Sequence, residues 1–220
     1  MPRMSSQTSP ASILAAGLHA LELDDTVPAA TQQRLLDYLA LLDQWNQHTN
    51  LTAVRERGAM VTRHLLDSLV LLPHVRGTRL ADLGSGAGLP GIPLALARPD
   101  LHVTLVDSNG KKARFLQAAI DTLKLNADVA HLRVEALRGS FDTITARALA
   151  SLSDMLRWGG HLLTRDNIWL AQKGRYPDAE LAALPAGYAA ATLPLHVPGL
   201  DAARHVVIIR RSDTGSRHAP

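Results

Sequence analysis

The stretch DLGSGAGLPG at residues 82–91 constrains this chain more than any other. It places four glycines and a proline in ten positions, directly after the apolar-ended run RLADL. Glycines lack the Cβ atoms that would keep a ligand away from the backbone, and a strand followed by such a loop and a helix is typical of ligand-binding parallel sheets. The chain is therefore expected to fold around a sheet whose first loop approaches a ligand closely.

Apolar patterning outside this loop indicates an α/β architecture. From residue 77 onward, short apolar runs alternate with segments of helical periodicity, as in a doubly wound, mostly parallel sheet. The predicted strands cover 79–84, 102–107, 129–134, 141–148, 168–174, 190–197 and 204–211, and the predicted helices cover 91–99, 111–125 and 151–158. Because the last two strands should form an antiparallel pair, we expect seven strands with an antiparallel C-terminal edge.

Three amphipathic helices are predicted before the sheet, at residues 10–22, 29–46 and 56–72. We therefore expect a helical N-terminal extension over 1–76, packed on an α/β core over 77–211, with a disordered tail over 212–220, all in one structural domain. No signal peptide and no apolar stretch long enough for a bilayer is recognised, which predicts a cytoplasmic protein without a membrane partner.

The composition narrows the chemistry. The chain has 220 residues and no cysteine, which excludes a disulfide framework, an iron–sulfur site and thiolate catalysis. Residues 1–54 hold two basic and five acidic side chains, whereas the remainder holds 21 basic and 15 acidic ones, a balance that suits a polyanionic partner or an ordinary basic surface. No candidate ligands have the spacing of a metal site. Trp45 and Trp158 are predicted core anchors.

The glycine loop fits two patterns. Gly86, Gly88 and Gly91 match the dinucleotide fingerprint G-x-G-x-x-G. Read from Asp82, the same loop matches D-x-G-x-G-x-G through Gly84, Gly86 and Gly88, a pattern used for a sulfonium cofactor. The first pattern implies a nicotinamide or flavin cofactor, and the second implies S-adenosylmethionine.

Neighbouring residues favour the sulfonium cofactor. A pyrophosphate needs free N–H groups at the start of the following helix, and Pro90 and Pro93 remove two of them. Asp82 is suited to an ammonium group such as that of a methionine moiety. Asp107, at the end of the next strand, can accept both hydroxyls of a ribose, which either cofactor contains.

Basic side chains are predicted around the same edge of the sheet. Lys111, Lys112 and Arg114 stand in the first turns of a helix, where the helix dipole disfavours cations. Either an anionic partner such as a phosphate backbone meets them, or they form a solvated surface. Arg147 and Lys173 follow strand ends on the cofactor side, where they would add positive charge to a cleft.

The segment 48–69 carries further polar candidates. Arg63 and Asp67 are spaced to pair on a helix surface, and His64 lies near Asp67 and Ser68 on one face. His64 and Asp67 are therefore the candidates for proton transfer, should the reaction need it.

In this order, the segments resemble the bacterial small-subunit (16S) ribosomal RNA guanine-N7 methyltransferases, also called glucose-inhibited division protein B. WNQHTNLTAVRE is similar to the family's W-N-x-x-x-N-L-T, RHLLDSLV to its R-H-x-x-D-S, and the L-P-G-I-P of the glycine loop is its most specific signature. DSNGKKARFL, ITARALASL, AQKG and RHVVII follow, so the resemblance covers about residues 30–210. It departs at Ala146, where the family usually has Ser, and in AQKG, where A-L-K-G is commoner.

The resemblance implies a Rossmann-like class I S-adenosylmethionine-dependent methyltransferase that modifies N7 of a specific guanine. It implies cofactor contacts at Gly84, Leu89, Asp107, Ser108, Asn109, Val134, Glu135 and Arg147, to which the loop pattern adds Asp82, Gly86 and Gly88. RNA contacts are expected at Arg63, His64, Lys111, Lys112, Arg114 and Lys173. The expected partner is 16S ribosomal RNA or the small ribosomal subunit, and no obligate protein partner is evident.

The chemistry of this reaction explains why no acid–base pair stands out. Guanine N7 has an available lone pair and a sulfonium methyl is electrophilic, so in-line transfer depends on positioning more than on proton transfer. Three alternatives stay open: a methyltransferase for another RNA, a protein or a small molecule; an NAD- or FAD-dependent oxidoreductase; and a non-catalytic nucleic-acid-binding protein.

Overall fold

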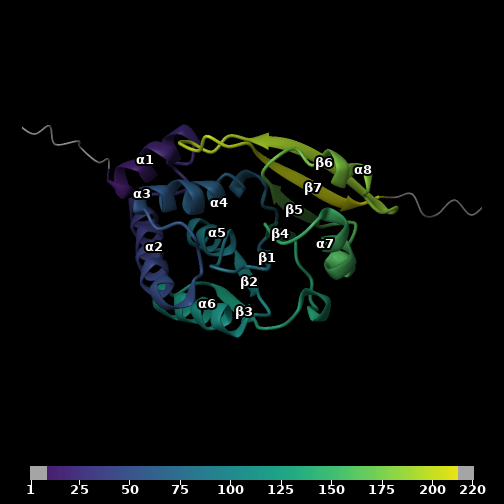
Figure 1. Cartoon of the computed structure of the whole chain (residues 1–220), viewed down its shortest axis with the longest axis horizontal. Helices are drawn as coiled ribbons and strands as arrows, with labels where there is room; N and C mark the ends of the chain where they lie inside the picture. The colour runs from purple at the N-terminus through teal and green to yellow at the C-terminus, as the bar shows by residue number, and fades with distance from the viewer. Residues whose placement is uncertain (1–8, 213–220) are drawn as a thin grey trace, which may run out of the picture.

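A seven-stranded sheet runs through the centre of the computed structural model, which describes residues 9–212 (Figure 1). Its strands are β1 (Arg79–Leu83), β2 (His102–Val106), β3 (Ala127–Ala130), β4 (Thr143–Arg147), β5 (Ile168–Lys173), β6 (Tyr188–Leu195) and β7 (Arg204–Arg211). Their order is β3-β2-β1-β4-β5-β7-β6, and β1 to β5 are parallel, whereas β7 pairs antiparallel with both β5 and β6. The predicted α/β fold and its antiparallel C-terminal pair are confirmed.

The strand order reverses at β1, which lies between β2 and β4. In an open parallel sheet, ligands bind beyond the carboxyl ends of the strands at such a switch point. The glycine loop follows β1 directly, so the topology places it at the expected binding edge.

Helices cover both faces of the sheet, because its residues alternate between two apolar clusters. The larger cluster joins Leu80 and Val103 of the sheet to α1 (Pro10–Ala20), α2 (Ala29–Thr49), α5 (Gly91–Ala97) and α6 (Gly110–Leu123). The second cluster joins Ala81 and Ile144 to α7 (Leu152–Gly159) on the opposite face. The N-terminal helices therefore share one core with the first strands. Figure 1 shows them at the purple end of the chain, beside α5 and α6. A short helix that was not predicted, α8 (Asp178–Ala182), precedes β6.

The predicted helix over 56–72 is not regular. It divides into α3 (Arg57–Met60), a π-helical segment (Val61–Leu66), α4 (Asp67–Leu69) and a 3-10 turn (Leu72–His74). Within it, the N–H of Asp67 donates to the Thr62 carbonyl five residues back, the spacing of a π-helix. Such segments widen a helix and occur frequently at functional sites.

The third predicted strand, 129–134, is also displaced. β3 is an edge strand that pairs only with β2, and the last register partners are Val106 and Ala130. Because β2 ends there, the chain beyond Ala130 has no ladder to join, and it forms a 3-10 turn over Val134–Ala136 instead. The predicted tail falls mainly on residues 213–220, outside the described residues.

Candidate functional site

The glycine loop after β1 has a backbone that only glycine adopts readily. Gly84, Gly86 and Gly88 have φ values of 70°, 59° and 85°, in the left-handed region. A Cβ atom on Gly84 would lie 2.5 Å from Cδ1 of Leu149, so a side chain there would collide with the opposite wall of the site.

Asp82 supports this loop from inside the protein. Its side chain is fully buried: Oδ2 accepts a hydrogen bond from the Gly91 N–H at 3.1 Å, and Oδ1 accepts one from the Thr145 hydroxyl at 3.0 Å. Burial raises the pKa of Asp82 to about 6, although these hydrogen bonds oppose the shift. Because the carboxylate has no accessible surface, the structure does not place it where an ammonium group of a ligand would lie. It joins β1, β4 and the start of α5.

Other contacts fix the loop from below. The hydroxyl of Tyr38, on α2, donates to the Ala87 carbonyl at 2.7 Å, so the N-terminal helices support the loop directly. Leu89 packs in the apolar core and is only 5% exposed, so it lies beneath the site rather than in it.

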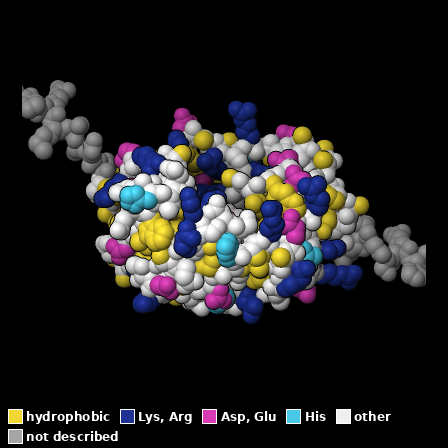
Figure 2. All heavy atoms as spheres, turned by 60° about the horizontal axis from the view of Figure 1, so that its bottom comes forward, with side chains coloured by type: hydrophobic (Ala, Val, Ile, Leu, Met, Phe, Trp, Pro, Cys, Tyr) yellow, Lys and Arg dark blue, Asp and Glu magenta, His cyan; other side chains and the backbone are white. Residues whose placement is uncertain are grey.

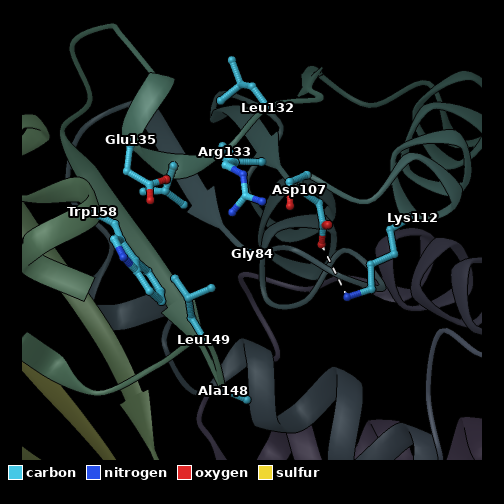
Figure 3. Close-up of a pocket in the computed structure, with 12 residues that line it drawn as sticks. Gly84, Asp107, Lys112, Leu132, Arg133, Glu135, Ala148, Leu149 and Trp158 are labelled. Carbon is cyan, nitrogen blue, oxygen red and sulfur yellow. Dashed lines mark ion pairs between the residues drawn. The ribbon is translucent and has the colours of Figure 1, made fainter. Parts of the chain in front are cut away.

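A cavity of about 420 Å³, here called the first cavity, opens beside Gly84 at the carboxyl ends of β1 and β2 (Figure 3). Its walls are Gly84, Val106, Asp107, Ser108, Lys112, Leu132, Arg133, Val134, Glu135, Ala148, Leu149 and Trp158. Figure 3 shows Trp158 and Leu149 on one side and Asp107 and Lys112 on the other, with the Arg133 side chain between them. The apolar wall and the facing carboxylate suit a molecule with both a flat ring and a hydroxylated part.

Asp107 is the best-ordered polar group of this cavity. Its Oδ2 accepts from the Gly86 N–H at 3.0 Å, its Oδ1 accepts from the Asn109 N–H at 2.8 Å, and Lys112 Nζ lies 3.7 Å from Oδ2. These bonds fix the carboxylate and leave acceptor capacity directed to the cavity, as a ribose diol requires.

Several predicted cofactor residues meet here, and others have supporting roles. Gly84, Asp107, Ser108, Val134 and Glu135 line the first cavity. Outside its lining, Gly86 holds Asp107, Gly88 is part of the turn, and the Asn109 side chain caps α6 by accepting from the N–H groups of Lys111 and Lys112.

Part of this wall was not predicted. Leu132 and Arg133 carried no motif, and Leu149 lay in the segment ITARALASL without an assigned role. Trp158, a predicted core anchor, packs partly buried against the second apolar cluster and also lines the cavity. Lys112, expected at RNA, lies here instead. The prediction for Trp45 holds, because it packs edge-on against Phe115 at 5.7 Å.

A second cavity, of about 410 Å³, adjoins the first. Its walls are Val54, Arg63, His64, Asp67, Arg147, Ala148, Gln172, Lys173, Gly174 and Arg204. Ala148 lines both cavities, and its φ of 52° is rare for a residue with a side chain. Arg147, expected at the cofactor, belongs to this second cavity. Non-glycine residues in this conformation cluster at functional sites.

Asp67 is the centre of the second cavity. Its Oδ2 pairs with Arg147 Nη1 at 3.0 Å, and its Oδ1 accepts from Arg204 Nε at 2.8 Å and from Gln172 Nε2 at 3.0 Å. The predicted surface pair with Arg63 is therefore wrong, because the π-helical segment ends with Asp67 facing the sheet, where its side chain is 4% exposed. One carboxylate thus joins the N-terminal segment to β4, β5 and β7.

His64 is buried beside it. Its Nε2 lies 2.9 Å from the Thr52 hydroxyl, and its Nδ1 makes no hydrogen bond of normal geometry. Burial lowers the pKa of His64 to about 4; the Arg147 cation acts in the same direction, while the Arg63 carbonyl and Asp67 oppose it. The imidazole is neutral near pH 7, and it contacts Thr52 rather than solvent.

The remaining basic candidates differ in their availability. Lys173 donates to the Ala150 carbonyl at 2.8 Å and to Glu180 at 2.7 Å, so its charge is balanced within the protein. Arg63, Lys111 and Arg114 have exposed side chains. On the face of the molecule that Figure 2 shows, Lys and Arg side chains lie beside a hollow in the surface.

Two kinds of feature are absent from residues 9–212. No group of three or more His, Asp or Glu side chains in this range is arranged to hold a metal ion. Within the same range, no helix has the length and apolar character needed to span a bilayer.

The candidate site thus consists of a glycine loop, an acid after the next strand and an adjoining cavity lined by cations. The profile of the GidB family, described as rRNA small subunit methyltransferase G, matches residues 31–207. The chain belongs to this family. It is 54% identical over 199 residues to the Ribosomal RNA small subunit methyltransferase G of Xanthomonas axonopodis pv. citri (strain 306), covering 89% of this chain and 92% of the relative. The protein of the same name from Stenotrophomonas maltophilia (strain K279a) is 53% identical over 213 residues, covering 94% and 99%.

Solved structures share the fold at lower identity. A point mutant of MtNAS in complex with S-adenosylmethionine superposes with a TM-score of 0.54 at 17% identity, covering 94% of this chain and 85% of that one. M. jannaschii TYW2 in complex with AdoMet has a TM-score of 0.52 at 15% identity, covering 66% and 74%.

Membership in the GidB family confirms three predictions: the family, methyl transfer as the activity, and S-adenosylmethionine as the cofactor. The oxidoreductase and non-catalytic alternatives are wrong. The interpretation of Pro90 and Pro93 as evidence against a pyrophosphate-containing cofactor agrees with this outcome.

Proposed function

We propose that this GidB-family chain transfers the methyl group of S-adenosylmethionine to N7 of a guanine in 16S ribosomal RNA. The observation that carries the proposal is the junction at Ala148 between a cavity suited to the cofactor and a cavity lined by cations. The relatives' name supports small-subunit ribosomal RNA as the substrate.

The first cavity fits the cofactor by its chemistry. Asp107 offers fixed carboxylate oxygens for the ribose, while Trp158 and Leu149 offer an apolar wall for a flat ring. The bound cofactor supplies an electrophilic methyl group on a sulfonium. The chain contributes the orientation of that group relative to the acceptor, a role that needs no proton acceptor.

The second cavity fits an acceptor that needs no deprotonation. Asp67 is bound by two arginines, and burial lowers the pKa of His64 to about 4, so neither side chain is suited to take a proton from a substrate. A hydroxyl or an amine acceptor must lose a proton during methylation, whereas guanine N7 attacks through its lone pair. Arg63 and Arg204 offer positive charge for the adjoining phosphates.

The decisive experiment combines the purified protein, labelled S-adenosylmethionine and small ribosomal subunits that lack the modification. We expect label in the 16S RNA at one guanine, and chain cleavage specific for 7-methylguanosine at that position. Asp107→Ala should reduce cofactor affinity at least tenfold by calorimetry and reduce transfer accordingly. Label in ribosomal protein, or on another base, would contradict the proposal.

A parallel reaction with naked 16S RNA separates the two forms of the substrate. We propose the assembled or partly assembled subunit, because the exposed cations lie on two elements, Arg63 on the π-helical segment and Lys111 and Arg114 on α6, and fit a folded surface better than one strand. The proposed location of the reaction is the cytoplasm. Equal rates with naked RNA would assign recognition to the RNA alone.

A further inference from the structure

Gln172, near the end of β5, carries a buried acceptor without a partner. Its Nε2 donates to the Asp67 carbonyl oxygen at 2.7 Å and to Asp67 Oδ1 at 3.0 Å. Both partners are acceptors, so the amide orientation is fixed and Oε1 is the remaining atom. Oε1 accepts no hydrogen bond from any described residue, and Gln172 is only 4% exposed. A buried acceptor in this state costs free energy, which a ligand donor would recover.

The neighbouring donors are committed elsewhere. Arg147 donates to Asp67 and to the Arg63 carbonyl, Arg204 donates to Asp67 and to the Ala203 carbonyl, and Lys173 donates to Glu180 and Ala150. These three cations therefore do not donate to Oε1. His64 Nδ1, in a residue of the same wall, also makes no hydrogen bond of normal geometry.

The sheet places Gln172 on the far side of the second cavity from the cofactor. Gln172 is the register partner of Arg147, and Ala148 follows Arg147 toward the first cavity. Since β5 is one strand farther from β1 than β4 is, Gln172 lies beyond Ala148 when seen from the glycine loop.

We propose that Gln172 is a specificity-determining residue whose Oε1 accepts a hydrogen bond from the Watson–Crick edge of the acceptor guanine. The inference rests on the proposed function. Guanine presents acceptors, N7 and O6, on its major-groove edge and donors, the N1–H and the 2-amino group, away from it. A base whose N7 faces the junction at Ala148 directs its donors toward β5. Entry of the base requires a small shift of the side chains that now cover Oε1.

Gln172 departs from the pattern of the resembled family. The position belongs to AQKG, where the resembled family commonly has A-L-K-G, and a leucine could neither hold Asp67 nor accept a hydrogen bond. Gln172→Leu is therefore the natural test variant.

The test measures kcat/KM on small subunits reconstituted with guanosine, inosine or 2-aminopurine riboside at the methylated position. Inosine lacks the 2-amino group, and 2-aminopurine riboside lacks the N1–H. With the wild-type protein, at least one analogue should react about fivefold less efficiently than guanosine, and Gln172→Leu should abolish that difference. A purely structural effect through Asp67 would instead lower all three rates by the same factor.

Controls separate this inference from the proposed function. Gln33→Leu, at an exposed glutamine that also bonds an aspartate (Asp37, 2.9 Å), should leave all three rates unchanged. The cofactor affinity of Gln172→Leu, measured by calorimetry, should equal that of the wild type. If the wild type methylates guanosine, but the kcat/KM of each analogue relative to guanosine is the same in Gln172→Leu as in the wild type, the inference is overturned while the proposed function stands. If the wild type does not methylate guanosine, the proposed function itself fails.

Discussion

His64 and Asp82 show how burial changes the behaviour of single side chains near the two cavities. The pKa of His64 falls to about 4 and that of Asp82 rises to about 6, both mainly through desolvation. A histidine that stays neutral in the folded protein but takes up a proton in the unfolded chain makes the free energy of unfolding depend on pH.

We predict that wild-type stability falls, relative to His64→Gln, as the pH is lowered from 6.5 toward 4. In this window the unfolded chain takes up a proton on His64 and the folded protein does not, so the unfolded state gains up to about 3 kcal/mol. Above pH 6.5 the difference between the variants should be constant. Urea unfolding at several pH values measures this, and parallel stability curves would refute the shifted pKa.

Single residues also show what a sequence pattern conveys. The positions of Gly84 and Asp107 were predictable, because one follows the first strand and the other the next strand, and both strands end at the same edge of the sheet. The role of Asp82 was not predictable: its motif position is the same whether the carboxylate faces a ligand or, as here, bonds Gly91 and Thr145. Gln172 lay in a recognised motif, but its contact with Asp67 spans 105 residues.

At the level of elements, the start of α5 packs closely against β1 and β2. A Cβ on Gly91 would lie 2.5 Å from Leu105 Cδ2 and 2.8 Å from Asp82 Oδ2. Gly91→Ala should therefore destabilise the protein by about 1–3 kcal/mol, as overpacking of a core does. Gly110→Ala, at the first residue of α6, is the matched control, because its nearest neighbour would be His131 at 3.5 Å. Thermal unfolding of both variants tests this; equal midpoints would contradict it.

The boundaries of elements were the less predictable part of the fold. Helical periodicity identified the segment 56–72, but periodicity does not reveal a π-helical turn, whose extra width depends on packing against the sheet. The end of β3 was missed for a related reason, since it depends on the length of its neighbour β2 and not on its own residues.

At the scale of the whole molecule, the basic side chains of α6 lie in two different places. Lys112 lies in the first cavity beside Asp107, whereas Lys111 and Arg114 are exposed on the same helix. We predict that Lys111→Ala together with Arg114→Ala reduces the slope of log affinity against log salt for the small subunit by about 1 to 2, without changing cofactor affinity. Filter binding across a salt series measures the slope.

The matching control uses Arg210, an exposed residue at the opposite end of β7 from Arg204. Arg210→Ala should retain the wild-type slope. If the Lys111 and Arg114 variant also retains it, these side chains belong to an ordinary solvated surface. The alternation of strands and helices made the overall architecture predictable. The different role of Lys112 was not predictable from the sequence, because it depends on the ion pair with Asp107 that the fold creates.

Ala148 has one further consequence. It borders both cavities with a side chain of one carbon, in a backbone conformation that would favour glycine. Reacting atoms must come within about 3–3.5 Å, and each added carbon would occupy about 1.5 Å of that interval. For the proposed reaction, added bulk at this single position would hold the methyl group and its acceptor apart, so the small size of the Ala148 side chain limits how far the rate of transfer can fall.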